Sequence, residues 1–368
     1  MALPCFIKSI NPMNFFKTLA IVGMACVGMV YAEETNHPEK AQTNTTLSAA
    51  SPLQKTPPEK PDLAADPSLP TNRPSPTDWL KDARIGAFMH YYPHDAESLK
   101  QVNDFDVEAL AKQLEHMGAK YFVITLGQNS GYYITPNAAY DRITGYQPGE
   151  RCATRDLPLD LYRALHSRGI RLMLYLPCQV PNRDIRAQKA FGLPEGPKDQ
   201  PIDVTFAKQW AEVIREWSLR YGDKVSGWWF DGGYQRIHFN EDIAGIYADA
   251  VKSGNKDAIV TFNSGVQLIR YTQAEDYTAG ETREPFFLVP KSRWVFGSQW
   301  HALTFLGSTW GMRNIREPTE RWRSWFHEVT THGGVVTFDM GPNKDMKTGP
   351  IGSICEEQAE QFRVIAQP

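Results

Sequence analysis

The chain is poor in cysteine, and none of its five cysteines belongs to a CxxC pair. Two of them precede the predicted folded domain, which therefore contains Cys152, Cys178 and Cys355. Three thiols can form at most one disulfide, so a disulfide scaffold is excluded. The missing CxxC spacing also disfavours a cysteine-based zinc site. We therefore expect no structural metal.

The sequence also lacks an excess of positive charge, with 39 Lys and Arg against 42 Asp and Glu. This balance gives no basis for binding to nucleic acid or to an anionic membrane. No GxGxxG or GxxxxGK[ST] motif follows an apolar run, which disfavours a nucleotide-binding sheet. Aromatic residues, in contrast, make up 12% of the chain. Such rings line sugar-binding clefts, although ordinary cores use them as well.

No apolar run is long enough to span a membrane comfortably. The apolar stretch within residues 18–32 follows Lys8 and Lys17 and ends with Val30 and Ala32, at the spacing of a signal-peptidase site. We expect residues 1–32 to be an export signal, a periplasmic or extracellular location, and no integral membrane domain after its removal. An uncleaved N-terminal anchor is the alternative. Residues 33–76 are rich in Pro, Ser and Thr, a composition that predicts a disordered linker. We expect residues 77–368 to form the folded domain.

From Trp79 onward, short apolar runs alternate with amphipathic stretches. We expect eight strands, at 85–91, 120–126, 171–177, 227–231, 258–263, 276–281, 302–307 and 334–340. Six helices are expected between or after them, at 106–118, 157–169, 204–222, 240–254, 318–333 and 353–366. This rhythm over roughly 290 residues predicts an α/β protein with a TIM-like (β/α)8 barrel, and a doubly wound sheet is the alternative. Residues 282–299 hold no predicted helix, so the barrel prediction is weakest there.

Polar residues gather at the carboxyl ends of the predicted strands, where such barrels carry their active sites. The strand ends supply His90, Tyr91, Tyr92, Gln128, Asn129, Tyr175, Asp231, Asn263, Glu281 and Asp339. These side chains include few cations, whereas a phosphate-bearing substrate calls for Arg and Lys. A neutral polyol with apolar ring faces, such as a sugar, fits this set better.

The stretch GWWFDGG at 227–233 places one aspartate at the end of an apolar strand. Glycoside cleavage needs two carboxyl groups across the scissile bond, one as nucleophile or base and one as acid. Asp231 is the candidate nucleophile, fixed by flanking rings such as Trp229, and Gly232 and Gly233 leave space for a substrate. A strand-end Asp that caps the next helix is an equally compatible interpretation.

Seven segments between residues 79 and 366 resemble, in the same order, the α-L-fucosidases of glycoside hydrolase family 29. The pattern W-x4-R-x-G-x-F-x-H at 79–90 is similar to their first strand, and GWWFDG to the strand that carries their nucleophile. The other segments are FDVEALAKQLEHMGAKYFVIT, TRDLPLDLYRAL, DYTAGE, WHALTFLGSTWG and GGVVTFDMGPNKDMKTGPIG. The resemblance implies a retaining glycosidase without a cofactor that acts on an oligosaccharide or glycoconjugate. Asp231 is then the nucleophile and Glu281 the acid/base, with Glu275 and Glu284 as alternatives.

The resemblance also implies a set of sugar contacts. His90 is expected to bind hydroxyl groups, with Gln128 and Asn129 in the places of two family histidines. Trp310 matches a family position near the pocket and, like Trp229, is a candidate substrate contact. Independently of the resemblance, Tyr132 is a candidate stacking ring, and loop packing is its alternative.

The chain departs from the family pattern at several positions. Besides Gln128 and Asn129, His301 replaces the Glu of the W-E-T motif and Asp339 the Asn of L-N-I-G-P. The chain ends soon after the last predicted helix, so no C-terminal β-sandwich is expected. These departures leave open another sugar, such as an α-galactoside, and a catalytically inactive carbohydrate-binding barrel.

Overall fold

The computed structural model describes residues 74–194, 196, 199–287 and 289–367. The predicted export signal 1–32 lies outside these ranges, as does the predicted linker 33–76 except for its last three residues. Within the described ranges, no helix combines the length and the apolar character needed to cross a membrane.

Seven strands form one curled sheet in the order β5-β4-β3-β2-β1-β9-β8. Every neighbouring pair is parallel, including β9 with β1, so the last strand of the domain pairs with the first. The α/β fold with a TIM-like barrel is therefore confirmed. The strands are β1 (Ile85–Met89), β2 (Tyr121–Thr125), β3 (Arg171–Pro177), β4 (Val225–Asp231), β5 (Ile259–Phe262), β8 (His301–Phe305) and β9 (Val335–Asp339).

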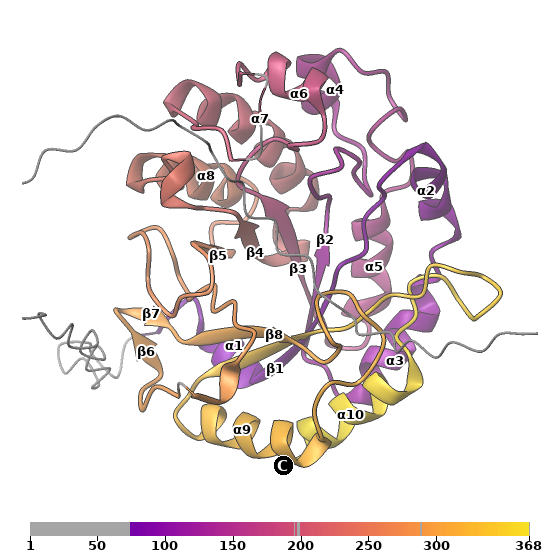
Figure 1. The fold of residues 1–368 in the computed structure, drawn as a ribbon, viewed down its shortest axis with the longest axis vertical. Helices are drawn as coiled ribbons and strands as arrows, with labels where there is room; N and C mark the ends of the chain where they lie inside the picture. The colour runs from indigo at the N-terminus through magenta and orange to yellow at the C-terminus, as the bar shows by residue number, and fades with distance from the viewer. Residues whose placement is uncertain (1–73, 195, 197–198, 288, 368) are drawn as a thin grey trace, which may run out of the picture. The chain divides into compact units, whose positions relative to one another are not determined.

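Helices surround the strands on the outside (Figure 1). All six predicted helices are present, as α3 (Val107–Met117), α5 (Leu157–His166), α7 (Val204–Tyr221), α8 (Glu241–Lys252), α9 (Thr319–Thr331) and α10 (Glu356–Ala366). Four of them begin after an Asp or Asn whose side chain accepts a hydrogen bond from a first-turn amide: Asp106, Asp156, Asp203 and Asn240. Four shorter helices were not predicted: α1 (Asp78–Ala83), α2 (Ala96–Lys100), α4 (Ala138–Thr144) and α6 (Ile185–Ala190).

The core has two layers, because a strand buried on both faces points alternate side chains inward and outward. The inner layer fills the barrel and includes Phe88, Tyr121, Tyr175, Trp229 and Leu303. Leu80 of α1 belongs to the same cluster and is fully buried, so the short first helix packs against the barrel interior. The larger outer layer lies between strands and helices. The inner rings form the floor of the barrel mouth described below.

The predicted strand at 276–281 is not a regular strand, and this prediction is corrected here. The segment instead forms isolated parallel bridges, Tyr277 with Gln299 and Glu281 with Leu303. At its start, the Asp276 amide donates to the Val260 carbonyl of β5 at 2.9 Å. The segment thus lies between the two edge strands β5 and β8, in the eighth position of the barrel. Gly280, with φ of +63°, interrupts the extended backbone and prevents a continuous ladder.

The absence of a predicted helix at 282–299 agrees with the structure. Among its described residues this stretch contains a 3-10 turn (Pro285–Phe287) and an antiparallel hairpin, β6 (Trp294–Val295) and β7 (Ser298–Gln299). The hairpin lies between α8 and α9 in the chain, where a regular barrel has a helix (Figure 1).

Gly280→Ala is expected to destabilise the domain by about 3 kcal/mol, because a left-handed backbone conformation and a steric clash coincide there. A Cβ at this position would lie 1.9 Å from the His301 carbonyl oxygen. Gly169→Ala is the matched control, since Gly169 has φ of +68° and no atom within 4 Å of its Cβ position. That variant should lose about 1 kcal/mol. Urea unfolding measures both losses, and equal losses would contradict the close packing at Gly280.

Candidate active site

A cavity of about 330 Å³ opens at the carboxyl ends of the strands. Seven of the eight residues predicted for the site line it: His90, Gln128, Asn129, Trp229, Asp231, Glu281 and Trp310. Phe88, Tyr92, Tyr175, Tyr234, Arg283 and Leu303 complete the wall. The structure thus brings together residues that are up to 220 positions apart in the chain because parallel strands end at one face of the barrel.

Asp231 ends β4 with both carboxylate oxygens engaged. The Tyr175 hydroxyl donates to Oδ2 at 2.6 Å, and Nδ2 of Asn263 donates to Oδ1 at 2.9 Å. The stacked rings of Tyr175 and Trp229, 5.3 Å apart, form the wall behind the carboxylate. Gly232 follows with φ of +78°, so the backbone turns sharply after the aspartate. Asp231 therefore has a fixed orientation at the cavity surface.

Glu281 lies opposite, on the irregular segment in the eighth barrel position. Its Oε2 accepts a hydrogen bond of 2.5 Å from the same Nδ2 of Asn263 that binds Asp231. The bound oxygens of the two carboxylates are therefore at most about 5.4 Å apart, the sum of the two hydrogen-bond lengths. Burial raises the pKa of Glu281, and the nearby Asp231 charge raises it further, whereas the Asn263 hydrogen bond lowers it.

Asn263 joins the two carboxylates; from the sequence it was one of the polar strand-end residues, without an assigned role. The side chain is fully buried at the end of β5. Its Oδ1 accepts from the Gly265 backbone amide at 3.1 Å. The backbone amide of Asn263 donates to the Phe230 carbonyl at 2.7 Å. Its place at a strand end was the only sequence signal for a role in the site.

Gln128 and Asn129 occupy the cavity wall after β2. Nε2 of Gln128 donates to the Tyr175 hydroxyl oxygen, and Oε1 of Gln128 accepts from the Asn129 amide at 2.9 Å. Burial, together with the charge of Asp231, raises the pKa of Tyr175 well above its usual range. Tyr175 therefore stays protonated and can donate to Asp231 while accepting from Gln128.

His90 and Trp310 also line the cavity and lie next to each other. Nδ1 of His90 donates to Oδ1 of Asp339 at 2.9 Å, and the His90 and Trp310 ring centres lie 5.7 Å apart. The side chain of His90 is 16% exposed. Asp339, one of the departures from the family pattern, thus lies directly behind a predicted sugar contact.

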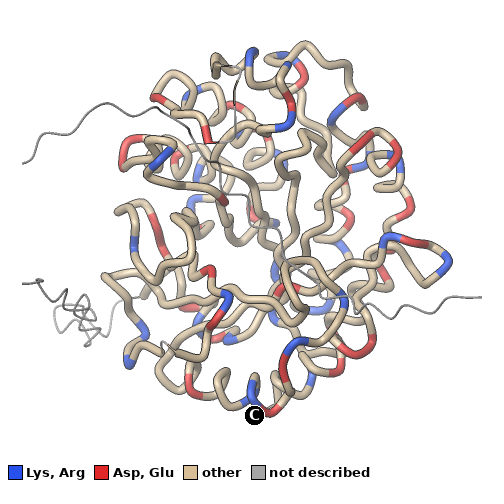
Figure 2. The backbone as a smooth tube through the Cα atoms, in the orientation of Figure 1, with Lys and Arg blue, Asp and Glu red and all other residues tan. Residues whose placement is uncertain are grey.

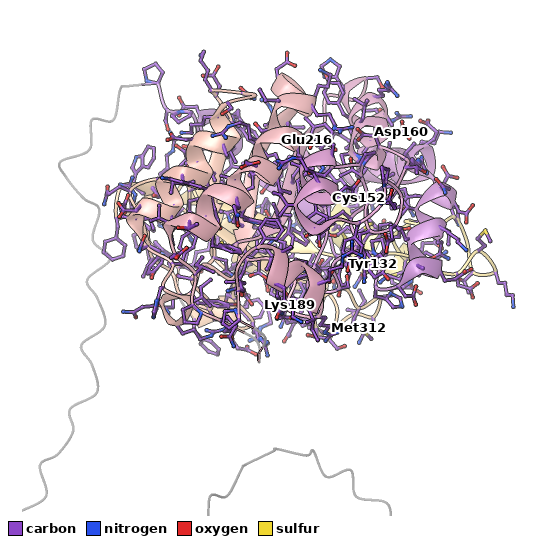
Figure 3. The ribbon with its side chains drawn as sticks, turned by 90° about the horizontal axis from the view of Figure 1, so that it is seen from above. Tyr132, Cys152, Asp160, Lys189, Glu216 and Met312 are labelled. Atoms are coloured by element: carbon purple, nitrogen blue, oxygen red, sulfur yellow. The ribbon has the colours of Figure 1, made fainter. Side chains whose placement is uncertain are left out.

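Tyr132 is the one predicted site residue that does not line the cavity. The Arg151 guanidinium lies over its ring at 4.3 Å. The next residue, Tyr133, forms a β-bridge with Cys152, and Figure 3 labels Tyr132 and Cys152. Of the two interpretations from sequence, the structure favours loop packing for Tyr132.

The alternative acids occupy other surroundings. Glu275 is buried and accepts hydrogen bonds from the Phe262, Tyr271 and Thr272 amides, and burial raises its pKa to about 7. It anchors the loop after β5 rather than lining the cavity. Glu284 is exposed and lines a neighbouring cavity of about 200 Å³. Neither carboxyl faces Asp231 as Glu281 does.

His301, which replaces the family glutamate, is buried inside the barrel. Its Nδ1 donates to the Thr278 carbonyl at 3.0 Å, and its Nε2 lies 2.7 Å from the Thr337 hydroxyl. Burial lowers the pKa of His301 to about 4, so the ring is neutral at ordinary pH. It supports the irregular segment and does not reach the cavity.

Charged residues lie mostly on the outer helices and loops, whereas the strands carry few of them (Figure 2). Of the Lys, Arg, Asp and Glu residues described in the structure, those that line the cavity are Arg283, Asp231 and Glu281. In the part of the chain that the structure describes, no group of three or more His, Cys, Asp or Glu side chains could hold a metal ion. The arrangement therefore supplies two carboxyl groups, several hydroxyl and amide groups, and aromatic walls.

A family model described as Alpha-L-fucosidase matches residues 92–367, about three quarters of the chain. A comparison with curated proteins gave no match.

Solved structures share the fold at low sequence identity. An α-L-fucosidase of glycoside hydrolase family 29 from Bacteroides thetaiotaomicron is 18% identical, with a TM-score of 0.57, over 80% of this chain and 73% of that one. The endo-fucoidan hydrolase MfFcnA9 of family 107 is 15% identical, with a TM-score of 0.64, over 79% of this chain and 63% of that one. The endo-fucoidan hydrolase MfFcnA4 is 15% identical, with a TM-score of 0.62, over 79% of this chain and 54% of that one. The chain thus spans less than two thirds of these endo-fucoidan hydrolases.

Proposed function

The chain belongs to the α-L-fucosidase family, glycoside hydrolase family 29, and from this premise we propose that it is a retaining α-glycosidase that hydrolyses α-L-fucosides. The family membership supports glycoside hydrolysis in general. The stereochemistry, the sugar and the roles of individual residues are the new parts of the proposal. The fold neighbours named as fucosidases and endo-fucoidan hydrolases favour the choice of sugar.

One observation carries the retaining mechanism: Asp231 and Glu281 share the Asn263 amide. Their bound oxygens are at most about 5.4 Å apart. Retaining glycosidases hold their two carboxyl groups about 5–5.5 Å apart, whereas inverting enzymes need about 6.5–9.5 Å to admit a water molecule. The upper limit set by Asn263 lies below the inverting range, which supports the retaining class.

The two carboxyl groups then have different roles. In the first step, an Asp231 oxygen attacks the anomeric carbon, and protonated Glu281 gives its proton to the departing glycosidic oxygen. In the second step, ionised Glu281 takes a proton from water, and the resulting nucleophile releases the sugar from Asp231. The raised pKa of Glu281 favours the protonated form that the first step requires. Tyr175 and Asn263 hold the side chain of Asp231 in a fixed orientation.

A panel of aryl glycosides tests this function directly. We expect the wild-type domain to hydrolyse an aryl α-L-fucoside and the Asp231→Ala variant to be inactive on it. Turnover of an aryl α-galactoside but not the fucoside would reassign the sugar and keep the chemistry. Sugar binding without turnover on every substrate would indicate a carbohydrate-binding barrel instead.

Asn263→Ala is expected to lower kcat by about 10- to 100-fold and to move the high-pH limb of activity upward. Glu281 must be protonated in the first step, so activity falls as pH rises through its pKa. The Asn263 hydrogen bond lowers that pKa, and its removal therefore raises it. A pH profile of kcat/KM measures the shift. A limb that stays in place or moves downward would contradict the link between Asn263 and Glu281.

The proposal includes export, which rests on the sequence of residues 1–32. Expression of the full chain in a bacterial host should yield a processed protein outside the cytoplasm whose N-terminus is Glu33. N-terminal sequencing checks this, and an intact Met1 on a membrane-attached protein would favour the uncleaved anchor.

A further inference from the structure

One buried carboxylate, Asp339 at the end of β9, holds two separate parts of the cavity wall. Its side chain is fully buried. Oδ1 accepts from Nδ1 of His90 at 2.9 Å, and Oδ2 accepts from the Gly311 amide at 2.6 Å. Burying a carboxylate costs free energy unless its oxygens are satisfied, and here each oxygen has one donor.

The first of these bonds fixes the tautomer of His90. A carboxylate only accepts hydrogen bonds, so the ring proton of His90 is held at Nδ1. Nε2 of His90 has no hydrogen-bond partner among the described residues, while the ring lines the cavity. A His90 ring that carries its one proton at Nδ1 therefore offers Nε2 as an acceptor to a ligand hydroxyl.

The second bond fixes the loop that carries Trp310. Gly311 has φ of +69°, and its Cβ position lies 3.6 Å from the His90 Cβ. Trp310 contacts the rings of both His90 and Phe305, with centroid distances of 5.7 and 4.7 Å. The loop and His90 thus meet at the same carboxylate.

An asparagine at this position could bond both partners only if His90 adopted the opposite tautomer. Its one acceptor oxygen would accept from the Gly311 amide, and its NH2 group would donate to an unprotonated Nδ1 of His90. The aspartate, which stands where the resembling motif has Asn, is therefore matched to this pair of donors.

We infer that Asp339 is a positioning residue that sets the His90 tautomer and the Trp310 loop, and thereby selects a sugar whose hydroxyl donates to Nε2 of His90. The kinetic part of this inference rests on the proposed function, whereas the tautomer does not depend on catalysis. Asp339→Asn keeps an oxygen for the Gly311 amide, so the effect of this substitution should act through His90 and should disappear when the imidazole is removed.

Histidine-ring ¹⁵N NMR tests the tautomer without any substrate, at a pH where the ring is neutral. His90→Ala identifies the His90 signals among the nine histidines. We expect wild-type signals of the Nδ1–H form and a shift toward the Nε2–H form in Asp339→Asn. An Nε2–H ring in the wild type, or an unchanged ring in the variant, would overturn the inference even if the domain had no glycosidase activity.

A double-mutant cycle tests the coupling. Asp339→Asn should lower kcat/KM on an aryl α-L-fucoside about tenfold in the wild type and less than twofold in the His90→Ala background. If no fucoside is turned over, calorimetric titration with L-fucose supplies the same comparison through Kd. Equal losses in both backgrounds would show a merely structural role. Asp156→Asn, which removes a helix-capping carboxylate in the outer layer, is the control and should leave kcat/KM unchanged.

Discussion

Replacing Asp231 with alanine is expected to lower kcat on an aryl α-L-fucoside by a factor on the order of 10⁴ or more. The variant loses the atom that attacks the anomeric carbon, and no other carboxyl faces the cavity besides Glu281 among the described residues. The domain should still fold, because Asp231 is only partly buried and the barrel core does not depend on it. Initial-rate kinetics and thermal unfolding measure the two effects.

Azide and a control variant make this result specific. A small anion can occupy the space that the missing carboxylate leaves and attack the same face of the sugar. Azide should therefore restore turnover of Asp231→Ala with an inverted product, identified by proton NMR. Asp223→Ala is the matched control, since Asp223 precedes the opposite end of β4 and is exposed. Near-wild-type activity in Asp231→Ala would end the proposed mechanism.

Replacing Glu281 with glutamine should lower kcat/KM about 10²- to 10⁴-fold on a substrate with a poor leaving group. On an aryl substrate whose leaving group needs no proton, the first step should be much less affected. Glutamine preserves the size of the side chain and cannot give a proton. The high-pH limb of activity should also disappear, because the group whose pKa is raised by burial and by Asp231 is gone.

Glu284→Gln is the control for this variant. Glu284 lies three residues along the same segment, is exposed and does not line the cavity with Asp231. We expect its kinetics and pH profile to match the wild type. A large loss in Glu284→Gln together with a mild one in Glu281→Gln would transfer the acid/base role to Glu284.

The alternation of apolar runs and amphipathic stretches predicted the barrel because each regular strand is buried on both faces. The strand predicted at 276–281, in the eighth barrel position, was wrong. Whether this segment forms a regular strand depends on the backbone conformation of one glycine. Gly280 adopts a left-handed conformation against the His301 carbonyl, and DYTAGE contains no pattern that reveals it. The short helices α1, α2, α4 and α6 were missed for a related reason. Helices of five to seven residues give too few periodic positions to detect.

The strand-end rule and the family resemblance predicted residues that line one cavity in the structure, whereas the contacts between these residues could not be predicted. Asn263 is an ordinary strand-end amide in the sequence, and only the geometry shows that it touches both Asp231 and Glu281. In the sequence, Asp339 is a strand-end acid that departs from a family motif, and only the structure shows its hydrogen bond with His90. Such pairings join residues far apart in the chain, and no local pattern encodes them.

Trapping of the covalent intermediate tests the central claim most directly. The domain is incubated with a 2-fluoro-fucosyl fluoride, whose fluorine slows the second step, and the modified peptide is identified by mass spectrometry. We predict one fluorofucosyl group on the peptide that contains Asp231, and none in Asp231→Ala. A label on another carboxylate, or steady release of an inverted product without any label, would contradict the assignment of Asp231 as the nucleophile of a retaining enzyme.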